Sequence, residues 1–187
     1  MTREELLAQI WKEARPLGVF GSEEERALES QKWLENVQPE WIDLFVDIFV
    51  HPPNYSTHQG KEDLGWYYTT VRALKECATK FPSMFLQKLG AGLSSDGARR
   101  WLLRAMAIPN MTDALPLIES LVERVRLSEE DLVTVIGTVR EIGGQKARLL
   151  LEKTEGTIPS SMATAQREIH NALRDLKSFE RQNARPQ

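Results

Sequence analysis

The chain has 187 residues, of which 41% are hydrophobic and 27% are charged. This length suits one domain or one short repeat array, and the hydrophobic fraction excludes a disordered chain. The net charge of −3 disfavours a general nucleic-acid binder, because such proteins carry a basic surplus that neutralises phosphates.

Helical periodicity dominates the chain, and strand-like alternation of apolar and polar residues is nearly absent. Local signals mark the ends of the predicted helices: Ser22 and Ser128 precede acidic residues as N-caps do, Pro82 stands where a helix begins, and Gly143 stands where one ends. In chain order, the pattern predicts helices at 2–14, 23–37, 39–51, 62–80, 82–91, 95–107, 111–126, 129–142, 145–154 and 160–180.

The connections between these helices are short except for residues 51–61, which form the one long loop of the prediction. The last residues, 181–187, are polar and predict a frayed tail. The longest apolar stretch, residues 44–50, is interrupted by Asp47 and is too short to cross a bilayer. We therefore expect no membrane association.

The single cysteine, Cys77, lies within a helical pattern. One cysteine excludes an internal disulfide and a thiolate zinc site, so a reducing compartment is the natural interpretation. The acidic N-terminus lacks the apolar core of a signal peptide. These features together predict a cytoplasmic protein.

The charges are unevenly distributed along the chain. Residues 1–63 hold 13 Asp and Glu against 6 Lys and Arg, whereas residues 64–187 hold 14 Asp and Glu against 18 Lys and Arg. We therefore expect the first segment to suit a basic partner and the second to suit an acidic one.

The spacing of the longer helices is the most informative feature of the pattern. Helices that start near 62, 95, 129 and 160 recur at intervals of about 31 to 34 residues, which is typical of a helix–turn–helix repeat. One such pair cannot bury its apolar face alone, so successive pairs stack into a solenoid.

Two stretches carry a resemblance to a known repeat. Residues 107–121 (AIPNMTDALPLIESL) resemble a HEAT repeat: a small residue and Ile end the first helix, a Pro-Asn turn follows, and the second helix opens with Ala-Leu-Pro-Leu-Ile. Residues 141–152 (EIGGQKARLLLE) are similar about one repeat later, without the proline. The resemblance covers about 95–155 and is also close to the HEAT-like type of the phycobilin lyases.

The resemblance implies an all-α fold, specifically a short right-handed α-α superhelix of about four to five helix pairs. We expect one helical-repeat domain over 1–180. Within it, residues 1–61 form a divergent N-terminal cap or bundle, and residues 62–180 form the regular helix pairs.

The first candidate site is a polar stripe on the otherwise apolar helix 39–51. Asp43, Asp47 and His51 are spaced i, i+4 and i+8, so they share one face. Such a stripe could hold a metal or a catalytic acid, could be the exposed, ion-paired seam of a nearly buried helix, or could contact the basic groups of a partner. The sequence supplies no clear further ligand, so we expect no metal and no cofactor.

Aromatic residues next to that stripe form a second group of candidates. Tyr55 lies in the predicted loop, and loops often carry recognition. Trp66, Tyr67 and Tyr68 follow on a helix and point about 100° apart, so one or two of them should be exposed. Exposed Trp and Tyr are typical of binding hot spots, although these rings could equally fill space between stacked helices.

A basic patch is the third candidate. Arg72 and Lys75 lie on one predicted helix, and Arg99, Arg100 and Arg104 lie on the first helix of the next pair. In a solenoid these helices are neighbours, so the five side chains could meet an acidic protein or a phosphate backbone. They could also form an ordinary solvated face.

No catalytic motif is present: the chain lacks a Gly-x-Ser-x-Gly, a phosphate-binding glycine loop and a His-Glu-x-x-His. The main hypothesis is a non-enzymatic module that binds a single protein partner, since solenoids present extended binding surfaces. Small bacterial HEAT-like proteins of this size include adaptors and immunity proteins that neutralise a toxin, and the resemblance extends the hypothesis to these.

Two alternatives remain open. A HEAT-like DNA glycosylase would bind DNA and use Asp43 or Asp47 with nearby aromatic residues and arginines, although the acidic net charge disfavours nucleic acid. A protein similar to the bilin lyases would hold a tetrapyrrole in a groove.

Overall fold

The computed structural model describes residues 1–14, 33–52 and 65–183. Within these ranges the chain consists of helices and turns and contains no strand, so the all-α prediction is confirmed. None of the helices in the described part is both long and apolar enough to span a membrane. Most of the helix predicted at 23–37, and most of the loop predicted at 51–61 with Tyr55, lie outside the described residues.

The chain divides into two compact units, Met1–Ala105 and Met106–Gln187. The described part of the first unit includes the helices α1 (Arg3–Ala14), α3 (Trp41–Val50), α4 (Gly65–Lys80), α5 (Pro82–Gly92) and α6 (Asp96–Met106), whose last residue is the first of the second unit. The second unit contains the 3₁₀ turn η1 (Thr112–Ala114), α7 (Leu115–Arg124), α8 (Glu129–Ile142), α9 (Gly144–Glu155) and α10 (Ala163–Asn183).

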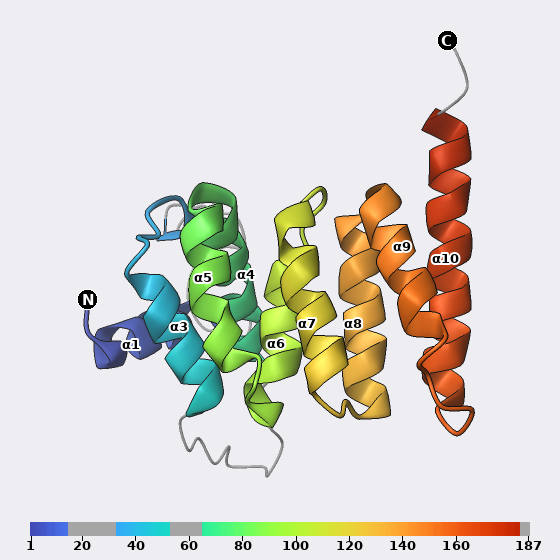
Figure 1. Cartoon of the computed structure of the whole chain (residues 1–187). Coiled ribbons are helices and arrows are strands. Elements are labelled where there is room, and N and C mark those ends of the chain that lie inside the picture. The colour runs from blue at the N-terminus through green and yellow to red at the C-terminus, as the bar shows by residue number, and fades with distance from the viewer. Residues whose placement is uncertain (15–32, 53–64, 184–187) are drawn as a thin grey trace. The chain divides into compact units, whose positions relative to one another are not determined.

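Helix α4 is the centre of the first unit, because it packs against α1, α3 and α5 (Figure 1). The apolar helix α3 contributes Phe45 and Phe49, which are almost completely buried. Helix α5 begins at Pro82, as the sequence predicts, since a proline in the first turn forfeits only an N–H that has no helical partner. At its other end, Gly92 allows a close approach to the side chains of Val46 and Leu102.

The ends of α8 follow the predicted signals closely. The Ser128 side chain accepts a hydrogen bond of 3.1 Å from the Asp131 backbone N–H, which caps the helix. The helix ends at Gly143, whose φ of 73° is a conformation that a residue with a Cβ rarely adopts. The two signals therefore define α8 as Glu129–Ile142, the range that the sequence predicts.

Several backbone groups of the second unit bond to residues about one predicted repeat away. The N–H of Asn110 donates to the carbonyl of Ile142 at 2.8 Å, which joins the turn before η1 to the end of α8. A carboxylate oxygen of Glu129, at the start of α8, accepts from the N–H groups of Thr164 and Ala165, at the start of α10. These bonds hold the turn before η1 against the end of α8, and the start of α8 against the start of α10.

Candidate functional site

Four side chains of α4 and α6 form what we call the aromatic surface: Tyr67, Tyr68, Trp101 and Arg104. The Tyr67 ring lies parallel to the Trp101 ring, with centroids 4.5 Å apart, and Tyr68 meets Trp101 edge-on at 5.7 Å. The guanidinium carbon of Arg104 lies 4.9 Å from the centroid of the Trp101 ring. Phe49 of α3 stacks against both Tyr67 and Trp101 from the core.

Exposure increases outward through this cluster. Phe49 is buried, Tyr67 and Trp101 are half-buried, and Tyr68 and Arg104 are exposed, with 56% of Tyr68 accessible to solvent. The inner rings therefore hold the outer groups in place at little entropic cost on binding, which is a property of hot-spot residues. Tyr68 is an exposed member of the predicted Trp66-Tyr67-Tyr68 group, and the Trp66 side chain lies outside what the structure describes.

The predicted basic residues separate into two kinds. Arg72 lies one turn after Tyr68 on α4 and is exposed, as is Arg104, whereas Lys75 and Arg100 are half-buried. Arg99 differs: only 2% of it is accessible to solvent.

The guanidinium of Arg99 serves the turn before α6. Its Nε donates to the Leu93 carbonyl at 3.0 Å, and its Nη2 donates to the Ser94 carbonyl and to the Asp96 carboxylate. These bonds satisfy carbonyls that would otherwise have no donor in the turn. Arg99 is therefore a structural residue here, and the exposed basic surface consists of its neighbours.

A gap in the side-chain cover lies beside Trp101. Gly97 is one turn earlier on the same side of α6, and a Cβ at this position would meet nothing within 4 Å. Helix α6 therefore has open space one turn before the aromatic surface.

The polar stripe of α3 is occupied by ion pairs. Asp47 accepts a hydrogen bond of 2.7 Å from Arg3 Nε and pairs with His51 Nδ1 at 2.8 Å, while Arg3 also donates to the His51 carbonyl. Asp43 pairs with Lys88 of α5. Partial burial by itself raises the pKa of Asp47, but the bonds from His51 and Arg3 outweigh it and lower that pKa.

These pairs explain the stripe as a seam that joins α3 to α1 and α5. Among the described residues, no group of three or more His, Cys, Asp or Glu side chains could hold a metal ion. The stripe carboxylates of Asp43 and Asp47 are thus both engaged in ion pairs.

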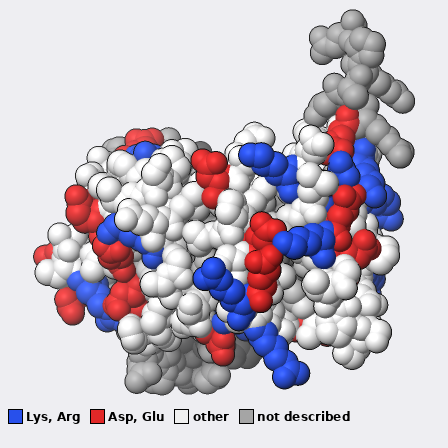
Figure 2. Space-filling model, in the orientation of Figure 1, with Lys and Arg blue, Asp and Glu red and all other residues white. Residues whose placement is uncertain are grey.

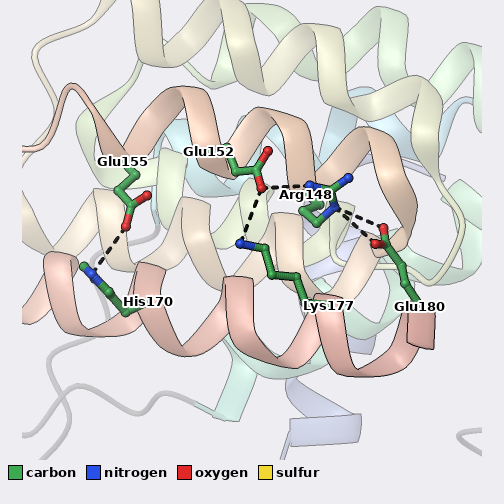
Figure 3. A network of polar contacts seen from close by, with 6 residues as sticks. All are labelled: Arg148, Glu152, Glu155, His170, Lys177 and Glu180. Atoms are coloured by element: carbon green, nitrogen blue, oxygen red, sulfur yellow. Dashed lines mark hydrogen bonds and ion pairs between the residues drawn. The ribbon is translucent and has the colours of Figure 1, made fainter. Parts of the chain in front are cut away.

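The second unit has a polar network between α9 and α10 (Figure 3). Arg148 bonds to Glu152 at 2.7 Å and to Glu180 at 3.2 Å, and Lys177 lies 3.6 Å from Glu152. Further along the same two helices, His170 Nε2 lies 3.4 Å from Glu155.

A groove of about 460 Å³ runs beside this network and is lined by His170, Arg174 and Lys177, among others. Basic and acidic side chains lie interleaved over α7, α9 and α10 on the face seen in Figure 2. One example is Lys153 of α9, which bridges Glu119 and Glu123 of α7 at 2.7 and 2.6 Å. Because these charges are paired, the face has little net charge to attract a ligand, and the network links helices.

Comparison with protein-family models, curated proteins and solved structures found no significant match to the chain. The aromatic surface is therefore interpreted from its own geometry.

Tyr67, Tyr68 and Arg104 are among the candidates predicted from the sequence, whereas Trp101 is not. One signal could have found Trp101: it follows Tyr67 by 34 positions, which is within the predicted repeat interval. Equivalent positions of neighbouring repeats come together in a solenoid, so an aromatic residue at each predicts a ring contact. The sequence does not predict that Tyr68 is the exposed ring, because three adjacent helical residues do not reveal which of them faces solvent.

Proposed function

We propose that this protein is a non-enzymatic module that binds one protein partner through the aromatic surface. The observation that carries the proposal is the contact set of Trp101, which holds an exposed tyrosine and an exposed arginine against a buried aromatic base. Tyr, Trp and Arg are the residues that most often dominate binding energy at protein interfaces. An adaptor or an immunity protein is the corresponding biological role.

We also propose that the scaffold is a short array of HEAT-like helix pairs. In the second unit, side-chain hydrogen bonds between different helices join residues 30 to 36 positions apart, a span centred on the interval of about 31 to 34 expected from the sequence. In the first unit, the bonds from Arg3, Lys80 and Lys88 span 44 to 48 positions instead. This difference supports a divergent N-terminal segment ahead of the regular pairs.

The two enzymatic alternatives receive less support. A glycosylase would need an available acid, yet Asp47 is held by Arg3 and His51, and Asp43 is held by Lys88. A bilin lyase would need a groove suited to a tetrapyrrole, whereas the α9–α10 groove is lined by charged residues that take part in ion pairs. Protein binding requires only the exposed surface that is present.

A site-specific cross-linker tests the proposed function. A photoreactive amino acid replaces Tyr68 in the full chain, and a matched control carries it at Phe179, which is 60% exposed in the second unit. We expect position 68 to capture one protein in the native host, with capture reduced by Arg104→Ala. Capture of only chaperones and ribosomal proteins, or the same products from position 179, would contradict the proposal.

A further inference from the structure

We propose that the aromatic surface binds an acidic segment of the partner protein, whose carboxylates pair with Arg72 and Arg104 while an apolar side chain rests against Tyr68 and Trp101 beside Gly97. This inference rests on the proposed function and specifies the chemistry of the partner. It is carried by the charge of α4–α6, the contacts of the two arginines and the open turn at Gly97.

The local charge is the first argument. Residues 65–105 hold seven Lys and Arg but only two Asp and Glu, within a chain whose net charge is −3. One of the two acids, Asp96, is paired with Arg99. Lys88 is likewise paired, with Asp43 of α3, so the surplus rests on the other cations of this range, Arg72 and Arg104 among them. Such a surplus would attract and orient an acidic chain.

The state of the two arginines is the second argument. Arg72 and Arg104 are both exposed, and within the described residues neither has a carboxylate partner. The Arg104 guanidinium lies over the Trp101 ring, which positions it without neutralising its charge. A guanidinium fixed in this way can form a bidentate pair with an incoming carboxylate at a reduced cost in side-chain entropy.

The shape of the surface is the third argument. Tyr68 stands edge-on to Trp101, and one turn before Trp101 a Cβ at Gly97 would meet nothing within 4 Å. An apolar side chain of the partner can therefore reach the rings between the two arginine-bearing helices. A segment that alternates acidic and apolar residues would satisfy both features at once.

A nucleic acid fits the same surface less well. Nucleic-acid binders commonly neutralise about 6 to 10 phosphates, whereas α4–α6 present few arginines beyond those that are buried or paired. A protein segment needs only two or three contacts of the kind that Arg72, Arg104 and the exposed ring of Tyr68 can supply.

Fluorescence anisotropy with labelled synthetic probes tests the inference on the full chain. The probes are a short peptide that alternates Asp and Glu with Phe and Leu, the same peptide with Lys in place of the acids, the same peptide with Ser in place of the acids, and a short single-stranded oligonucleotide. We expect binding of the acidic peptide alone, and weaker binding when salt is raised to about 0.3 M.

Substitutions locate the binding on the surface. Arg72→Ala and Arg104→Ala should each lower the affinity for the acidic peptide by about two- to fivefold, which is the effect of losing one exposed ion pair. Arg126→Ala, which removes an exposed arginine of the second unit, should leave the affinity for the acidic peptide unchanged. Gly97→Glu should weaken binding of the acidic peptide and Gly97→Lys should strengthen it. A Cβ at this position meets nothing within 4 Å, so circular dichroism should show both variants folded.

The remaining outcomes overturn the inference. These are tighter binding of the oligonucleotide, equal binding of the Ser peptide, an equal loss with Arg126→Ala, or self-association of the chain that Arg104→Ala abolishes, which would make the occupant a second copy. If no peptide binds but position 68 still captures one protein, the inference fails and the proposed function stands. If position 68 captures nothing, the proposed function itself fails.

Discussion

The rings of Tyr67 and Trp101 lie parallel at 4.5 Å, although 34 positions of sequence separate them. A ring pair of this kind contributes about 0.5 to 1.5 kcal/mol beyond the area that it buries. Its larger consequence is positional: it fixes α4 against α6, so that Tyr68 and Arg104 share one platform. A surface that is rigid before binding loses little entropy when a partner arrives.

The packing of α6 against α5 gives the first prediction. A Cβ at Gly92 would lie 2.6 Å from Leu102 Cδ1 and 2.8 Å from Val46 Cγ1. Leu102 is fully buried and Val46 has a stiff branched side chain, so neither can move aside freely. We expect Gly92→Ala to lower the free energy of unfolding by about 1 to 3 kcal/mol, measured by urea denaturation.

Gly97→Ala is the matched control for that substitution. The new methyl group meets nothing within 4 Å, and alanine favours a helix over glycine by up to about 1 kcal/mol. The variant should therefore be as stable as the native chain or more so. Equal effects of the two substitutions would show that helix propensity, and not the close approach at Gly92, determines the outcome.

The ion pairs of Asp47 give a prediction about pH. The pKa of Asp47 in the folded chain lies below its ordinary value of 3.8, so folding favours the charged form. The resulting stability is complete above the unfolded pKa and is lost as pH falls through the folded pKa. We expect Asp47→Asn to cost up to about 1 kcal/mol near neutral pH, and this cost should shrink below about pH 4.

Urea denaturation at a series of pH values measures that difference. Asp113→Asn, at an exposed position of the second unit, controls for the loss of one negative charge and should change stability by less than about 0.5 kcal/mol throughout. A deficit of Asp47→Asn that grows as the pH falls would contradict the ion-pair account.

The contact between α8 and α10 gives the third prediction. Glu129 Oε1 accepts from the N–H of Thr164 at 2.7 Å and from that of Ala165 at 3.3 Å, so it caps α10 from another helix. Glu129→Ala should lower the free energy of unfolding by about 0.5 to 2 kcal/mol, the usual cost of a lost cap.

Hydrogen–deuterium exchange gives a direct measurement of this cap. In Glu129→Ala the amides of Thr164 and Ala165 should exchange faster, because both lose their acceptor. Glu130→Ala removes the same charge from the next position and should leave both amides protected. Unchanged protection in Glu129→Ala would refute the capping role.

Local signals predicted the secondary structure better than the packing. The Ser128 cap and the Gly143 stop define α8 within the chain itself, so its bounds follow from the sequence. The helix predicted at 111–126 is instead a 3₁₀ turn followed by α7, which begins at Leu115. Pro116 lacks the N–H that a continuous helix would need at that point, so the α-helix can begin only just before it.

The side-chain environments in the candidate site, in contrast, could not be predicted from local sequence signals. Arg99 and Arg100 are adjacent in the sequence, but a rotation of about 100° per residue turns Arg99 toward the carbonyls of the preceding turn and leaves Arg100 half-buried. No local pattern distinguishes them, because the difference depends on the path of residues 93–95. The ring contacts of Trp101 likewise join three helices, and only the repeat interval between Tyr67 and Trp101 anticipates one of them.

The single cysteine gives the last prediction. Cys77 is buried in α4, and this burial raises the pKa of its thiol to about 12. Because the thiolate is the reactive form, almost none of it is present at about pH 8. Alkylation by iodoacetamide, followed by mass spectrometry over a urea series, should therefore occur only as the first unit unfolds, whereas the fully unfolded chain should react at once. Comparison with the loss of helical circular dichroism then shows whether the first unit unfolds together with the rest of the chain. Labelling of the native chain at the rate of a free thiol would mean that α4 opens readily, and a rigid aromatic surface on that helix would then be untenable.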